Sequence, residues 1–202
     1  MSRYTGPKAR INRRLGLAVF ESAGALKAMD RKPNPPGMQP PPRKLSKHGE
    51  AMREKQKIKY YYGLGERKLR RIFAKARHQQ GNTGENALLM CERRLDSVIR
   101  QAGLTKTRPQ ARQGVAHGHF LVNGRRTDIP SMMVRSGDVI DVKRRPGILT
   151  LYQSCLAETD GRIADWLAFD AESFRIIVAR LPAEEDITLP VDVGVVVELL
   201  SR

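Results

Sequence analysis

The side chains best suited to chemistry in this sequence are cations at regular spacing. Arg108 and Arg112 are four positions apart in a helical pattern, so both point from the same side of that helix. The pair Arg125-Arg126 follows Asn123-Gly124, a dipeptide typical of a two-residue turn between antiparallel strands. Guanidinium groups held at fixed positions bind phosphate oxygens well. The spacing therefore predicts a cationic surface for the ribose-phosphate backbone of RNA.

Catalytic and metal chemistry has weaker support. The tripeptide Arg94-Leu-Asp96 resembles the one that carries the catalytic aspartate of pseudouridine synthases, but the chain after Val142 is too short for a separate domain that encloses a flipped base. His117 and His119 have no Cys or further His close in sequence to complete a metal site. The motifs GxxxxGK[ST], GxSxG and HExxH are absent. We expect no enzyme activity, no cofactor and no metal, and we expect Asp96 to pair with a nearby arginine or to cap the fold.

Two helices and a hairpin are predicted to position the cations. The second helix runs from Thr107, a suitable N-cap, to His117, and the hairpin and a later strand, 139–142, follow it. The first helix is predicted as one continuous segment that ends at Gly103. Its apolar stripe recurs every three or four positions, at Leu88, Cys91, Leu95, Val98 and Ala102.

Charge is unevenly distributed along the chain. The 37 Lys and Arg against 21 Asp and Glu give a net charge of +16, which favours a polyanionic partner. Residues 1–90 carry 21 basic and 6 acidic side chains, residues 91–150 carry 12 and 5, and residues 151–202 carry 4 and 10. Only the last quarter repels phosphate. No apolar run could span a membrane, and the N-terminus lacks an apolar signal core, so we expect a cytoplasmic protein without a membrane partner.

The first 45 residues are predicted to be a basic, Pro-rich extension. Residues 2–14 contain too few apolar side chains to fold alone, so we expect them to become ordered on RNA; a disordered solubilising arm is the alternative. Residues 32–42 are Pro-rich, which predicts an extended loop.

A helical domain is predicted over residues 46–90. Its helices are expected at 46–62 and 65–80, and the second has an apolar face opposite three cations, Lys68, Arg71 and Lys75. Such a cationic face is often merely solvated, but few acids balance it here, which favours a role facing phosphate. Asn82, with Glu85 three positions later, is predicted to begin the next helix.

Residues 146–202 are predicted to be acidic strands and helices that complete the sheet and pack on the helical domain. Apolar runs at 165–170, 174–180 and 193–200 are typical of strands. Trp166 has apolar or acidic neighbours, so we expect a core residue rather than a platform for base stacking. Cys91 and Cys155, each in an apolar segment, are expected to be buried thiols rather than a disulfide.

Short matches along the chain resemble the family of bacterial small-subunit ribosomal protein four. They begin with Arg3-Tyr4 and Gly6-Pro-Lys8, and many more follow in order over about fifty residues of the basic region: Arg94-Leu-Asp96, Thr107-Arg108, Ala111-Arg-Gln113, His117-Gly-His119, Val122-Asn-Gly124, Pro130-Ser131 and Gly137-Asp138. Many members carry a zinc-binding cysteine cluster near the Pro-rich loop. This chain has no Cys or His between Arg31 and Lys47, so it resembles a variant without that metal.

The fold class expected from pattern and resemblance is α+β. An all-helical N-terminal domain is joined to a small RNA-binding α+β module, residues 91–145, in which two or three helices pack on a mostly antiparallel sheet. The resemblance implies that this module is inserted into the helical domain and that C-terminal residues pack back on it.

The resemblance also implies a function. Members are structural constituents of the small ribosomal subunit that bind 16S ribosomal RNA early, nucleate assembly of the subunit body, line the site where messenger RNA enters, and contribute to translational accuracy. Their neighbours are small-subunit ribosomal proteins five and three. A free-standing RNA-binding factor and a pseudouridine synthase-like enzyme remain as alternatives.

The residues predicted to bind RNA are mostly basic and lie within the first 145 positions. Replacing Arg108 and Arg112 together with Ala is expected to lower the salt dependence of RNA binding by ~1.4. The full predicted set is Arg3, Tyr4, Lys8, Arg10, Arg13, Arg14, Arg43, Lys44, Lys47, Arg53, Lys55, Lys57, Lys59, Lys68, Arg71, Lys75, Arg94, Arg108, Arg112, Gln113, His117, Asn123, Arg125, Arg126, Lys143 and Arg144.

Overall fold

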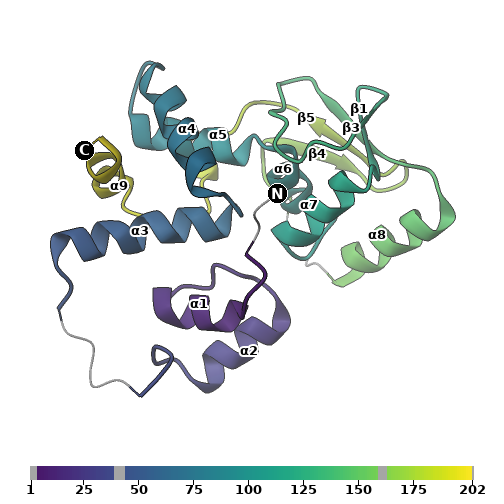
Figure 1. Ribbon diagram of the computed structural model, residues 1–202. Helices are drawn as coiled ribbons and strands as arrows, with labels where there is room; N and C mark the ends of the chain where they lie inside the picture. The colour runs from purple at the N-terminus through teal and green to yellow at the C-terminus, as the bar shows by residue number, and fades with distance from the viewer. Residues whose placement is uncertain (1–3, 39–43, 159–162, 202) are drawn as a thin grey trace. The chain divides into compact units, whose positions relative to one another are not determined.

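A computed structural model describes residues 4–38, 44–158 and 163–201 (Figure 1). The chain divides into two compact units. A helical unit comprises residues 1–87 and 189–202, and a sheet unit comprises residues 88–188. The fold class is α+β, as predicted.

The helical unit is built from amphipathic helices. Their bounds are α1 Lys8–Leu15, α2 Ala23–Arg31, α3 Lys47–Tyr61, α4 Glu66–Arg77, the first part of α5 Thr83–Glu92, and α9 Val193–Ser201. Helix α3 begins as predicted, because the Ser46 hydroxyl accepts a hydrogen bond from the Gly49 amide. The Asn82 carboxamide likewise accepts from the Gly84 amide at 2.9 Å and caps α5.

Two segments of the helical unit differ from what the sequence pattern indicated. Residues 8–15, which were expected to contain too few apolar side chains to fold alone, form helix α1, and the buried Asn12 side chain donates to the Phe20 carbonyl and accepts from the Phe20 amide, both at 2.9 Å. These bonds fix the turn that brings Val19 and Phe20 into the core. Residues 193–200 form helix α9 and not a strand; α9 packs against α3, where a strand would have no partner.

The sheet unit combines helices with an antiparallel sheet. Its elements are α6 Leu95–Gln101, α7 Arg108–Ala116, β1 Phe120–Val122, β2 Arg125–Thr127, β3 Val139–Val142, α8 Pro146–Glu158, β4 Leu167–Asp170, β5 Arg175–Val178 and the 3₁₀ turn Glu184–Asp186. Among the described residues, the five strands pair in the order β2-β1-β3-β5-β4, each pair antiparallel.

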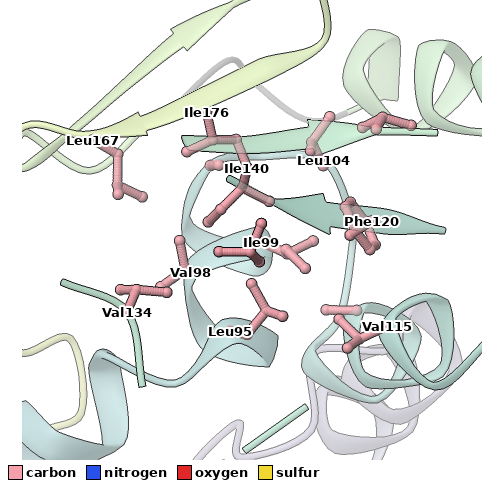
Figure 2. Packing of buried hydrophobic residues seen from close by; sticks show 14 of the residues in the cluster. Leu95, Val98, Ile99, Leu104, Val115, Phe120, Val134, Ile140, Leu167 and Ile176 are labelled. Atoms are coloured by element: carbon pink, nitrogen blue, oxygen red, sulfur yellow. The ribbon is translucent and has the colours of Figure 1, made fainter. Parts of the chain in front are cut away.

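The core of the sheet unit lies between its helices and one face of the sheet. Figure 2 shows Val98 and Ile99 of α6 pointing toward Ile140 of β3, with Val115 of α7 near Phe120 of β1. Trp166 is fully buried in the same cluster, as predicted. Both cysteines are buried free thiols.

The predicted continuous helix up to Gly103 is interrupted between Glu92 and Leu95. The backbone at Arg94 is extended, and it bridges Met133. The Leu95 amide donates to the Met132 carbonyl at 2.9 Å, and the Val134 amide donates to the Arg93 carbonyl at 2.9 Å. Two helices, α5 and α6, replace one because the 130–134 segment binds the backbone between them.

Helix α8 was not predicted. Its first residue, Pro146, favours a helix start, and Leu149, Tyr152 and Cys155 follow at intervals of three, with Leu156 next to Cys155, on the side that packs on the core. Residues 146–202 were predicted to contain strands and helices, but only the strands were assigned to particular apolar runs. This spacing was the signal that could have identified the helix.

Candidate nucleic-acid interface

Arg94, which precedes α6, and the two arginines of α7 lie close to acids of the sheet unit itself. Arg94 is 2% exposed and donates from Nε and Nη2 to the two carboxylate oxygens of Asp96, at 2.9 and 2.5 Å. The Nη1 atom of Arg112 lies 3.5 Å from the same carboxylate. Asp96 therefore pairs with arginines, as predicted, and it does so in the protein interior.

Arg108 lies in a second internal cluster. Its Nη2 atom lies 3.5 Å from a carboxylate oxygen of Glu92. The side-chain NH₂ group of Gln101 donates to the same carboxylate at 2.7 Å. Glu92 is fully buried, and Arg108 is 8% exposed. The guanidinium groups of Arg94 and Arg108, which were predicted to bind RNA, are therefore buried beside carboxylates of the same unit.

The hairpin presents its cations to solvent. Asn123 and Gly124 have φ of 50° and 76°, the left-handed values that a tight turn requires. The Asn123 side chain donates to Asp138 and accepts from the Val139 amide, both at 2.9 Å. Arg125 and Arg126 are exposed on β2. The turn chemistry thus fixes the backbone of the hairpin that carries the two guanidinium groups.

Other predicted side chains surround the end of α7. Gln113 and His117 are exposed near its C-terminus. The Lys143 amide donates to the His119 carbonyl at 2.7 Å, which places the segment after β3 beside this helix end. Lys143 is half-buried, and Arg144 is exposed. The hairpin and the 143–144 segment thus bring cations to the sheet unit's surface, and the end of α7 adds the polar side chains of Gln113 and His117.

In the helical unit, two predicted cations contact the protein's own backbone. The Arg13 guanidinium donates to the carbonyls of Asn34 and Pro35, at 2.8 and 3.4 Å, and so holds the Pro-rich loop against α1. The Arg53 guanidinium donates to the Arg14 carbonyl at 2.9 Å. These arginines stabilise the N-terminal segment.

The rest of the N-terminal set is partly exposed. Tyr4 stacks on Phe20 with ring centroids 5.9 Å apart, and the Lys8 ammonium lies 6.0 Å from the centre of the Phe20 ring. Arg10 and Arg14 have exposed side chains, as do Lys44 and Lys47. Arg3 and Arg43 lie outside the described residues.

The lysines of α3 pair with acids. Lys55 is 6% exposed and donates to Glu66 at 2.7 Å, and Lys59 donates to the same carboxylate at 3.2 Å. Lys57 donates to Glu54 at 2.6 Å. The hydrogen bond from Lys55 holds the pKa of Glu66 below its ordinary value, with a smaller contribution from Lys59. The buried Lys55 is therefore a core residue and not a surface ligand.

Helix α4 carries the densest exposed set of cations on one element. Leu69, Phe73 and Ala76 face the core. Lys68, Arg71 and Lys75 are exposed, as predicted from helical spacing. Three further exposed arginines of α4 were missed by the prediction, which followed a single face of the helix: Arg67, Arg70 and Arg77.

Other kinds of site have no support in the described part of the chain. No group of three or more His, Cys, Asp or Glu side chains there could hold a metal ion. Burial raises the pKa of the Cys91 thiol, so this thiol stays protonated and is a poor nucleophile. None of the helices within the described ranges is long and apolar enough to cross a membrane.

The whole chain is similar to known proteins. Residues 3–92 match the family model described as the ribosomal protein S4/S9 N-terminal domain, and residues 93–140 match the S4 domain. The chain is 57% identical over 202 residues to the small ribosomal subunit protein uS4 of Rhodopirellula baltica, with all of both chains covered. Identity to the uS4 proteins of Opitutus terrae and Persephonella marina is 43% and 42%, again with full coverage of each chain.

These relatives are ribosomal structural proteins and not enzymes, which agrees with the prediction that the Arg94-Leu-Asp96 tripeptide has no catalytic role. The exposed cations of α4 and of the hairpin suit the same kind of protein. The chain belongs to the family of small ribosomal subunit protein uS4.

Proposed function

We propose that this protein is a primary binder of 16S ribosomal RNA that nucleates assembly of the body of the small ribosomal subunit in the cytoplasm. The observation that carries the proposal is the exposed cationic surface of α4. Its side chains stand on a rigid helix whose opposite face is buried through Leu69 and Phe73. Folded RNA is recognised mainly through its phosphates and its shape, so a stiff array of charges suits it.

The hairpin of the sheet unit offers a second set of contacts. Arg125 and Arg126 are exposed, and Asn123 fixes the turn that carries them. Two cationic elements far apart in the sequence support binding where several RNA helices meet, because one protein can then neutralise phosphates from more than one helix.

Messenger RNA and neighbouring proteins are the further partners that we propose. Exposed Lys44 and Lys47 are suited to RNA where the messenger enters. Helix α9 has six apolar residues among nine; Val196 is buried and the other five are half-buried, so part of its apolar surface remains accessible to ribosomal proteins five and three. A change at such a contact between proteins would alter translational accuracy.

Reconstitution tests the proposal. Small-subunit RNA made by transcription is mixed with the protein, and binding is measured between 50 and 200 mM salt, a range over which several phosphate contacts change affinity by orders of magnitude. We expect tight, strongly salt-dependent binding, and we expect subunits assembled with the protein to retain it through a high-salt wash. Release in that wash would favour a free-standing RNA-binding factor instead.

A further inference from the structure

The end of α7 contains a side-chain contact that the cationic surfaces do not explain. The hydroxyl of Tyr152, on α8, lies 3.1 Å from Nδ1 of His119. Tyr152 is 1% exposed, so its hydroxyl is cut off from water. Gly114 makes the contact possible, because a Cβ at that position would lie 2.4 Å from the Tyr152 oxygen.

The geometry determines which atom donates. A buried hydroxyl hydrogen needs an acceptor, and among the described residues Nδ1 of His119 is the only one within reach of Tyr152. Burial raises the pKa of Tyr152, so the hydroxyl keeps its proton. Burial, and then the charge of His117, lower the pKa of His119, so the ring is neutral near pH 7. A neutral imidazole that accepts at Nδ1 carries its proton on Nε2.

The Nε2 atom of His119 is available to a ligand. It has no hydrogen-bond partner within the described ranges, and it is not among the fully buried polar atoms that lack one, so part of it is accessible to solvent. The backbone around the ring is held firmly, since the His119 amide donates to the Gly114 carbonyl at 3.0 Å and its carbonyl accepts from Lys143. The exposed His117 ring lies 5.8 Å away, centroid to centroid.

One cation lies near this donor. The guanidinium of Arg126 packs on Gly118, where a Cβ would lie 2.5 Å from its Nε atom. Gly118 is next to His119 in the chain, so the hairpin arginine and the histidine lie at the same end of α7. A phosphate held by the hairpin would place backbone oxygens of the RNA near Nε2.

We propose that His119 binds RNA as a neutral hydrogen-bond donor through Nε2, that its ligand is a phosphate or ribose oxygen of the RNA backbone, and that Tyr152 is the positioning residue that sets this tautomer. The inference rests on the proposed RNA-binding function and assigns a role to two residues outside the cationic set. The hydrogen bond adds affinity without adding charge.

The tautomer is tested first in the free protein. Nitrogen-15 NMR of the histidine side chains distinguishes a proton on Nε2 from one on Nδ1. We expect the Nε2–H form for His119 at pH 7 and a mixture of both forms in Tyr152→Phe, which keeps the ring in the core and removes only the hydroxyl. An Nδ1–H form in the unmodified protein would overturn the proposal whatever the RNA-binding result.

The RNA contact is tested with a matched pair of variants and transcribed small-subunit RNA. In His119→Gln the side-chain NH₂ group reaches the position of Nε2, whereas in His119→Asn it reaches only that of Nδ1. We expect Gln to bind like the unmodified protein and Asn to bind about two- to tenfold more weakly, the usual range for one neutral hydrogen bond. Tyr152→Phe should fall between them.

Salt dependence separates this contact from a charged one. Neither His119 variant should change the slope of log affinity against log salt, whereas Arg125→Ala should lower it by about 0.7 to 0.9. Equal affinity of the Asn variant, equal losses in both variants, or a changed slope would overturn the proposal. Failure of the unmodified protein to bind RNA would instead overturn the proposed function, and the NMR result would still report the tautomer.

Discussion

Helix α4 of the helical unit and the segment from Arg94 to the end of α7 in the sheet unit each contain four arginines, yet these arginines differ in exposure. Lys68, Arg71 and Lys75 of α4 have exposed side chains. Arg94 and Arg108 are nearly buried, and the carboxylates of Asp96 and Glu92 accompany them into the core. The difference shows that the number of cations in a segment does not measure its capacity to bind phosphate.

The positions of the acids determine which arginines are buried. A buried guanidinium is tolerated only when a carboxylate accompanies it, because an unpaired charge costs several kcal/mol to desolvate. In α4 the one acid, Glu66, lies at the first residue and is already bound by lysines of α3. In the α5–α7 region the two buried acids lie close to arginines: Glu92 to Arg108, and Asp96 to Arg94 and Arg112.

Removing a buried acid should have the largest effect. In Asp96→Ala, Arg94 loses its carboxylate while it remains buried, and Arg112 loses its neighbour. We expect the free energy of unfolding to fall by roughly 3–5 kcal/mol, measured by urea denaturation. The matched control is Asp141→Ala, whose partner Arg175 is 45% exposed; it should cost only about 0–1 kcal/mol. Equal losses in the two variants would break the distinction between interior and surface arginines.

The second-largest effect should be on RNA binding, to which exposed cations should contribute more than buried ones. Replacing Lys68, Arg71 and Lys75 with Ala should lower the salt slope of RNA binding by about 2.1 to 2.7, for three lost phosphate contacts. The free energy of unfolding should change by less than about 0.5 kcal/mol, because the three side chains lie on the solvent face.

Arg108→Met is the matched variant in the sheet unit. It should leave the salt slope unchanged and destabilise the fold, because Glu92 then keeps a buried charge without its arginine. This revises the expected loss of ~1.4 in slope for the Arg108 and Arg112 double variant, which assumed that both side chains face RNA. A lowered slope in Arg108→Met would restore that assumption.

The sequence contained enough information for most local structure. Hydrophobic period, caps and turn dipeptides predicted α3, α4, α7 and the hairpin, and the charge gradient predicted which part of the chain is basic. These features depend on neighbours in the sequence. Resemblance over the whole chain supplied the family.

Sequence spacing could not predict which arginines are buried. Arg108 and Arg112 share one side of a helix, but the acids close to them come from other elements. Glu92 is the last residue of α5, and Asp96 lies in α6. The interruption itself depends on backbone pairing of Arg94 with Met133, nearly forty positions away. Helix α9 was mistaken for a strand because a run of valines favours strands locally, and only packing on α3 overrides that preference.

A glycine within α7 offers a smaller test of how closely this helix is packed. Gly114→Ala should destabilise the protein by about 1–3 kcal/mol, because the new Cβ would lie 2.4 Å from the buried Tyr152 hydroxyl and 3.1 Å from the Phe120 ring. Gly147→Ala, in α8, has no atom within 4 Å of the new Cβ and should stabilise by up to about 1 kcal/mol. Thermal unfolding measures both. A gain in Gly114→Ala would mean that α7 is as loosely covered as the outer face of α4.

Acid should reveal the smallest effect, at Glu66, where α4 meets the lysines of α3. Its pKa is lowered in the folded protein, chiefly by the hydrogen bond from Lys55, so folding favours the charged carboxylate. This stabilisation is fully present above the ordinary pKa of 4.5 and is lost as the pH falls through the lower, folded value. Because Glu66 is 37% exposed, we expect less than about 1 kcal/mol. Glu66→Gln should lose this part of the acid dependence of unfolding, measured by urea denaturation between pH 3 and 7. If the acid dependence of unfolding were unchanged in Glu66→Gln, Lys55 would be stable in the core without this carboxylate. Buried cations would then require a partner acid only in the sheet unit.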